Sequence, residues 1–165
     1  MRTMRLLPIF LAAAALAACS PQAGNASSSG AASQAEGTRH PVSGLEVIPL
    51  TITHDGASHA FRVEVARSEA EQAKGLMFRT GMGADEGMIF PREPAAPAAF
   101  WMKNTVIPLD IIFIGSDGRI TNIEANAEPY SLTPRLSQGA AAAVLELNGG
   151  RAAELGIGPG DSVAW

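Results

Sequence analysis

The chain has little that would support covalent cross-linking, nucleic-acid binding or a membrane span. Its 165 residues contain one cysteine, Cys19, which excludes an internal disulfide and a cysteine-based metal site. The formal net charge is −4 and no run of basic residues occurs, so nucleic acid is not an expected partner. The longest apolar run, residues 6–18, is shorter than the roughly 20 residues that a membrane-spanning helix needs.

The first 18 residues instead have the pattern of a secretory signal peptide. Arg2 and Arg5 give a basic start, and the apolar run ends in small residues just before Cys19. The sequence Leu-Ala-Ala-Cys at residues 16–19 resembles a bacterial lipobox. That resemblance implies lipidation of Cys19 and an extracytoplasmic, membrane-anchored protein. Because Ser20 is not an aspartate, the rule for lipoprotein sorting favours the periplasmic face of the outer membrane in a cell with two membranes.

The rest of the chain divides into a linker and one domain. Residues 19–44 are rich in Ser, Ala and Gly and contain hardly any bulky aliphatic side chains, a composition typical of a flexible tether. Residues 45–165 are enough for a single domain with a modest core. Removal of the two arginines of the signal peptide would make the net charge about −6.

The pattern of this domain predicts a mainly β fold. Residues 59–66 alternate between apolar and polar, as expected of a half-buried strand, and Ser68 with Glu71 forms a capping box that begins a short helix ending near Gly75. A second short helix is predicted at residues 149–155. Further strands are predicted at residues 45–53, 87–90, 98–105, 109–114, 119–124, 141–147 and 162–165. Such a pattern indicates a β-sandwich of jelly-roll-like type or a small barrel, with two short helices.

Several segments, in this order, resemble a known family. They are FRVEVA (61–66), GLMFR (75–79), GMIF (87–90), FWMKNTVIPLD (100–110), VLELNG (144–149) and LGIGPGDSV (155–163). Together they are similar to domain of unknown function family 192, a bacterial and archaeal family with secreted or lipid-anchored members. The resemblance implies a compact β-sandwich or jelly-roll domain. It implies no activity and no cofactor.

Residues 100–110 place polar side chains beside strongly apolar sequence. If the strands on either side of Pro108 form a hairpin, Lys103 and Asp110 lie nearly opposite each other, close enough for an ion pair. One interpretation is a salt bridge that fixes the hairpin. The other is a ligand site, in which Lys103 binds an anion or takes part in acid–base chemistry while Asp110 and Asn104 orient it. Trp101 would then form a stacking wall for a sugar or aromatic ligand, or belong to the core.

Two further charged residues are candidates for this polar cluster. Arg79 carries a planar guanidinium group suited to bidentate recognition of Asp110 or of a ligand carboxylate. Glu146 interrupts an apolar strand, so it needs a partner such as Arg79 or Lys103 if it faces inward. If it faces outward, it is a solvent-facing residue of an edge strand.

The sequence leaves three hypotheses of function. The first is a lipid-anchored binding or accessory module for a small anionic or sugar-like ligand, or for an envelope protein. The second is a hydrolase- or lyase-type enzyme using Lys103 with Asp110 or Glu146. The third is a Cu(I)-binding protein, because thioether and imidazole groups suit that ion; the candidate ligands are Met77, Met88, Met102 and His59. Since methionine also fills gaps in cores, no resident metal is expected.

Overall fold

The computed structural model describes residues 38–165. The predicted signal peptide, Cys19 and linker residues up to 37 lie outside the described residues, so these assignments remain predictions. Residues 38–44, predicted as linker, are part of the domain: Thr38 and Arg39 pair with Val47 and Glu46. The described elements, in chain order, are β1 (Thr38–Arg39), β2 (Glu46–His54), β3 (Ala57–Val65), α1 (Glu69–Lys74), β4 (Glu86–Phe100), β5 (Leu109–Ile114), β6 (Ile120–Ala127), β7 (Arg135–Asn148), α2 (Arg151–Glu154) and β8 (Ser162–Ala164). Neither described helix is long and apolar enough to cross a membrane.

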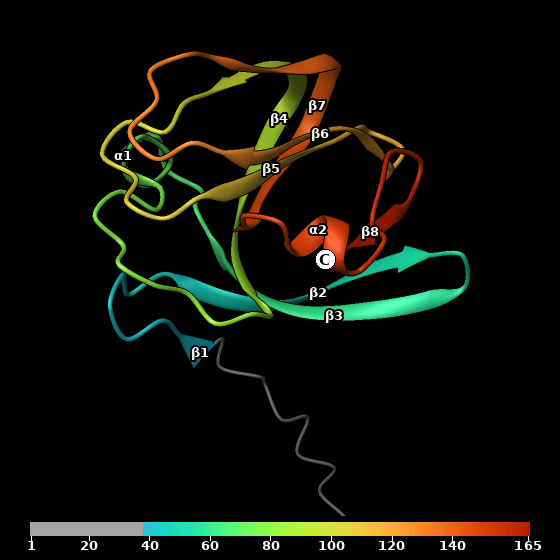
Figure 1. The fold of residues 1–165 in the computed structure, drawn as a ribbon, viewed down its shortest axis with the longest axis horizontal. Coiled ribbons are helices and arrows are strands. Elements are labelled where there is room, and N and C mark those ends of the chain that lie inside the picture. Colours follow the sequence, from blue (N-terminus) through green and yellow to red (C-terminus); the bar gives the residue numbers. More distant parts are fainter. Residues whose placement is uncertain (1–37) are drawn as a thin grey trace, which may run out of the picture. The chain divides into compact units, whose positions relative to one another are not determined.

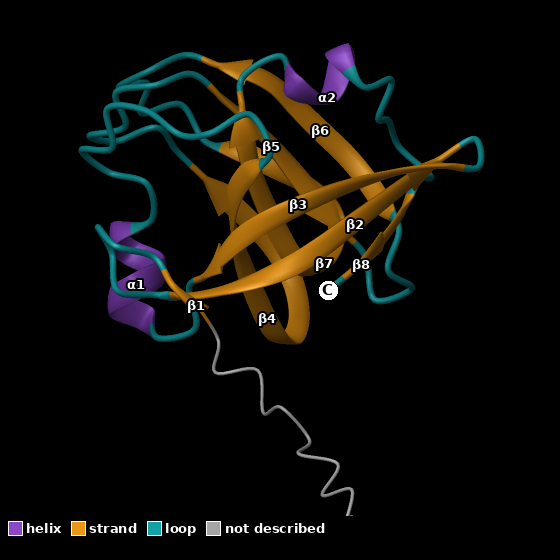
Figure 2. Ribbon diagram, turned by 90° about the horizontal axis from the view of Figure 1, so that it is seen from below, coloured by secondary structure: helices purple, strands orange, loops and turns teal. Residues whose placement is uncertain are grey.

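The strands form one curled sheet, and the prediction of a mainly β fold with two short helices is confirmed (Figures 1 and 2). The strand order is β1-β2-β3-β4-β7-β5-β6, and β8 pairs with β2. All pairings are antiparallel except that of β3 with β4. A parallel pair needs a crossover connection, which here contains α1.

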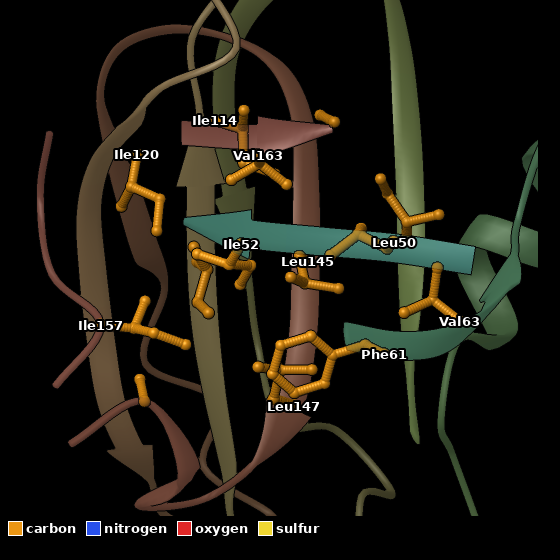
Figure 3. Close-up of a cluster of buried hydrophobic side chains, with 14 of the residues drawn as sticks. Leu50, Ile52, Phe61, Val63, Ile114, Ile120, Leu145, Leu147, Ile157 and Val163 are labelled. Carbon is orange, nitrogen blue, oxygen red and sulfur yellow. The ribbon is translucent and has the colours of Figure 1, made fainter. Parts of the chain in front are cut away.

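Both faces of the central strands are buried. On β5, Ile112 and Ile114 belong to one apolar cluster, while Ile111 and Phe113 belong to another. Successive side chains of a strand point to opposite faces, so the two clusters occupy the two sides of the sheet. Figure 3 shows the first cluster, in which residues of β2, β3, β7 and β8 meet. The second cluster includes an edge-to-face pair of Phe90 and Phe100, whose ring centroids are 5.0 Å apart.

Two predicted boundaries are wrong. The sequence indicated two strands separated by a proline-rich loop at residues 91–97, but β4 runs through this region as one strand. It does so because its pairing with β7 skips residues at two irregularities, between Pro91 and Ala96 and between Pro97 and Ala99. Proline is tolerated at such irregularities because it has no N–H to donate to a ladder. Likewise β7 begins at Arg135, within a predicted loop.

Candidate ligand-binding site

The predicted hairpin around Pro108 is not formed. β4 ends at Phe100, and the following segment to residue 108 consists of turns and loop. β5 pairs with β6 and β7 and not with β4. Lys103 and Asp110 therefore do not face each other across a ladder, and the predicted ion pair between them is wrong.

Asp110 has a structural role: it joins β5 to the end of β6 and to the start of α2. It is completely buried, and its carboxylate accepts hydrogen bonds from the backbone N–H groups of Asn126 (2.8 Å), Gly150 (2.9 Å) and Ala152 (2.8 Å). These three donors belong to the end of β6 and to the start of α2. A carboxylate near the first turn of a helix also satisfies N–H groups that have no partner within the helix. Asp110 thus fastens α2 to the sheet.

Arg79 is paired with a residue that the sequence pattern did not single out. Its Nη2 donates to both carboxylate oxygens of Glu64, at 2.8 and 3.0 Å, and its Nη1 lies 3.3 Å from Nε2 of His40. The hydroxyl of Ser43 also donates to Glu64. Glu64 is only 3% exposed, and this bidentate contact is what makes burial of its charge tolerable.

Glu146 has no such partner. It lies on β7, between β4 and β5, and is only 5% exposed. Register pairs Glu64 with Met88 and Met88 with Glu146, so the two carboxyl groups belong to one row across three adjacent strands. Within residues 38–165 the Glu146 carboxyl has no hydrogen-bond donor or cation within contact distance. Burial alone raises its pKa to about 8, so the group is uncharged at neutral pH.

Strand packing and alternation determine which face of the sheet Glu146 occupies. A Cβ atom at Gly87 would lie 2.6 Å from the Glu146 carbonyl oxygen, so β4 and β7 pack closely here only because residue 87 is a glycine. The neighbours Leu145 and Leu147 belong to the first apolar cluster. By alternation, Glu146 points to the other face of the sheet, toward α1 and the turn after β4.

A cavity of about 240 Å³ opens on that face, and Glu146 lines it. We call it the Glu146 cavity. Its other walls come from α1 and the residues that follow it, from β4 and from the turn at residues 101–105; the polar and aromatic lining residues are Gln72, Lys74, Arg92, Trp101, Lys103 and Thr105. Three predicted residues, Trp101, Lys103 and Glu146, are therefore brought together at one cavity.

The cationic residues of the cavity are also without carboxylate partners. Among the described residues, neither Lys74, Arg92 nor Lys103 lies within 4.0 Å of an acidic oxygen. Nε of Arg92 is buried without a hydrogen-bond partner. The ammonium group of Lys103 lies 5.3 Å from the ring centroid of Trp101, a cation–π distance. The Glu146 cavity thus combines three unpaired cations with one unpaired carboxyl group.

Asn104 is not among the residues that line the cavity, but it stabilises the turn that carries Trp101 and Lys103. It adopts a left-handed backbone conformation (φ 55°), which asparagine tolerates better than most residues. Its carbonyl accepts a 2.8 Å hydrogen bond from the N–H of Phe78, joining the turn after β4 to the segment after α1. Nearby, the N–H of Met102 donates to Ser131 and that of Tyr130 to Thr105. Trp101, half exposed at 51%, is therefore carried by a turn with backbone bonds to two other loops.

The methionines do not form an accessible cluster. Met88 and Met102 are buried in the second apolar cluster, and Met77 receives a contact from the Asn104 amide, at 3.7 Å to sulfur. His59 lies on β3, near Asp161. Burial acts to raise the pKa of Asp161, but the N–H of Gly158, then His54 and last His59 together lower it. Within the described residues, no three His, Cys, Asp or Glu side chains converge as a metal site. The methionines therefore fit the role of core residues.

Sequence reasoning missed Lys74 and Arg92 as cavity residues. Arg92 lies two residues after Phe90 and four after Met88 on β4, so alternation places it on the same face of the sheet as these two residues of the second apolar cluster. This alternation is visible in the sequence, but it applies to Arg92 only if the strand continues past Pro91, which the sequence did not predict. Lys74 ends α1, and its position above the cavity depends on how the helix packs, for which the sequence carries no local signal.

Comparison with known proteins places the chain in a family. The model of DUF192, described as "Uncharacterized ACR", matches residues 50–165. The chain belongs to the DUF192 family. The chain is also similar to proteins of known crystal structure. A protein of unknown function from Novosphingobium aromaticivorans DSM 12444 is 60% identical with a TM-score of 0.77, over 80% of this chain and 94% of that one.

The second structure is of a candidate transcription regulator from Sinorhizobium meliloti 1021. It is 40% identical with a TM-score of 0.71, over 73% of this chain and 94% of that one. No curated protein matches the chain. Since DUF192 is a family without an assigned activity, the function of this member has to be argued from the Glu146 cavity.

Proposed function

We propose that this DUF192 protein is a lipid-anchored binding module of the cell envelope, and that the Glu146 cavity holds its ligand. The observation that carries the proposal is the unpartnered carboxyl group of Glu146. Because Glu146 lines an open cavity and has no hydrogen-bond partner within residues 38–165, a bound ligand can supply the contact that the fold does not. The raised pKa of Glu146 supports the same conclusion, because strongly perturbed groups concentrate at functional sites.

The size and lining of the cavity fit a small polar ligand. A volume of about 240 Å³ corresponds to about eight water molecules in the liquid, enough for a small metabolite or one sugar ring. Lys74, Arg92 and Lys103 would bind anionic groups, and Gln72 and Thr105 offer hydrogen bonds to hydroxyls. Trp101 offers an aromatic face at the rim. A small anionic or sugar-like ligand is therefore the proposed class.

The proposed cellular setting comes from the N-terminal sequence. The lipobox-like residues before Cys19 support a lipid anchor, and the Ser/Ala/Gly-rich composition of residues 19–37 supports a linker between that anchor and the domain. Ser20 supports the periplasmic face of the outer membrane. Nucleic acid is not a proposed partner, because the net charge is −4 and no basic run occurs.

The enzyme hypothesis survives in one form only. Asp110 is fully engaged by backbone donors, whereas Lys103 and Glu146 line the same cavity. An uncharged carboxyl with a pKa near neutrality is suited to general acid chemistry. Turnover of a bound compound would therefore extend the binding function, with Glu146 as the acid.

The two tryptophans of the chain provide the test. Trp101 lies at the cavity rim and is 51% exposed, while Trp165, at the C-terminus, is 47% exposed and lies outside the cavity lining. In a Trp165→Phe variant, Trp101 is the only tryptophan, and a cavity ligand should change its emission and raise the melting temperature. The matched Trp101→Phe variant should lose the fluorescence response. The proposal fails if envelope metabolites that stabilise the protein leave Trp101 emission unchanged.

A further inference from the structure

We infer that the ligand of the Glu146 cavity is a small anion, and that one of its oxygens accepts a hydrogen bond from the uncharged carboxyl group of Glu146. This inference rests on the proposed function and names the ligand class and the donor. It divides the cavity into two parts. Lys74, Arg92 and Lys103 supply charge, and Glu146 supplies a neutral O–H donor.

The charged groups that line the cavity favour an anionic ligand. The ionisable residues lining the cavity are Lys74 from α1, Arg92 from β4, Lys103 from the turn after β4, and Glu146 from β7. The three cations have no carboxylate partner within residues 38–165. A pocket with three unpaired cations attracts anions and repels cations. Only an ionised Glu146 would offset this preference.

The carboxyl group of Glu146 stays uncharged at neutral pH. A buried carboxylate needs donors or a cation, and this fold supplies them where they are required: Glu64, in the same row of the sheet, has the guanidinium of Arg79 at 2.8 Å. Glu146 has neither, and its burial raises the pKa to about 8. The cations that line the cavity do not come within 4.0 Å of its carboxyl in the described residues. The proton therefore remains on Glu146 at neutral pH.

A protonated carboxyl beside an anion forms a charge-assisted hydrogen bond, which is short and stronger than a neutral one. The anion in turn favours the protonated form of Glu146, because two neighbouring negative charges repel. Lys103 supports such binding, since its ammonium lies over the ring of Trp101 at the rim and not in a salt bridge. A ligand that carried an ammonium group toward Glu146 would require the ionised form instead. The affinity for an anion should therefore fall as pH rises, and the affinity for a ligand with an ammonium group should increase.

The experiment measures binding of four probes to the protein by calorimetry and by Trp101 emission in the Trp165→Phe background. Succinate and sulfate are the anions, glycine betaine is the zwitterion and glucose is the neutral polyol. None of the four changes its charge appreciably between about pH 7 and about pH 9, so any pH dependence in this range belongs to the protein. The variants are Glu146→Gln, which keeps a neutral donor of the same shape, and Lys103→Met.

We expect at least one of the anions to bind, with an affinity that falls about tenfold per pH unit above about pH 8, where Glu146 loses its proton. Glu146→Gln should bind the anion without this fall. Lys103→Met should bind it roughly tenfold more weakly, with the fall in affinity retained. Agreement of all three results supports the inference, because a merely structural glutamate would not place the pH dependence on this one residue.

Other outcomes overturn the inference and differ in what they leave standing. If glycine betaine or glucose binds at Trp101 and the anions do not, the ligand class is wrong. If Glu146→Gln abolishes anion binding, or if anion affinity rises with pH, the assignment of Glu146 as a neutral donor is wrong. In each of these cases the proposed function stands. If none of the four probes binds or changes Trp101 emission, the inference and the proposed function both fail.

Discussion

Replacement of Glu146 by glutamine should stabilise the domain at neutral pH, although it changes a buried residue. The pKa of Glu146 rises from 4.5 to about 8 on folding. Between these values the folded domain keeps a proton that the unfolded chain releases, so stability falls as pH rises through this window. Each pH unit corresponds to 1.36 kcal/mol, so the loss at pH 7 is about 3 kcal/mol. Glutamine does not titrate and avoids this loss.

The assay is urea unfolding of wild type and Glu146→Gln at about pH 4, 5.5 and 7. We expect nearly equal stability at the lowest pH and a difference of about 3 kcal/mol in favour of the variant at pH 7. The matched control is Glu64→Gln, which alters an equally buried carboxylate that is paired with Arg79. This control should destabilise the domain at pH 7. A Glu146→Gln difference that is negative, or that is the same at all three pH values, would refute the reasoning.

Further substitutions test the other contacts. Asp110→Ala leaves one buried and two partly buried backbone donors without their acceptor and should cost about 3 kcal/mol of unfolding free energy, measured in urea; a loss below about 1 kcal/mol would contradict the structural role. Arg79→Lys replaces the bidentate contact to Glu64 and should cost about 2 kcal/mol, with an unchanged melting temperature as the contrary result. Ser68→Ala removes the helix cap of α1 and should cost about 1 kcal/mol by the same assay. Lys103→Met changes an exposed residue and should shift stability by no more than about 0.5 kcal/mol; a large loss would show that Lys103 is a structural residue after all.

Local signals in the sequence predicted local structure well. The capping box at Ser68 and Glu71 is formed, and α1 ends at Lys74, next to Gly75. Alternation placed Phe61 and Val63 in the core correctly. The errors arose where pairing partners are distant in sequence. Alternation determines which residues of a strand share a face, but not which strand lies next to it. β7 lies between β4 and β5 in the sheet although it is distant from both in sequence, so β4 and β5 do not pair as the predicted hairpin requires.

The same limit applies to the candidate site. The sequence marked Glu146 because an acid interrupts an apolar strand, and the structure places it in a cavity with Trp101 and Lys103. It did not mark Glu64, because alternation on β3 was interpreted with one face in solvent. In the structure the second face is also covered at that point, by the segment around His40 and Ser43 and by Arg79. Coverage of a sheet face is a tertiary property, and strand periodicity does not contain it.

The central claim is that an uncharged, unpaired carboxyl group lies at the Glu146 cavity. The most direct measurement is the chemical shift of the Glu146 side-chain carboxyl carbon, followed by NMR as the pH is raised. The structure predicts that this signal titrates at about pH 8, far above the ordinary value of 4.5, while the fold is retained. A titration near the ordinary value would mean that the carboxyl is ionised and solvated, and would contradict both the unpaired acid and the ligand class inferred from it.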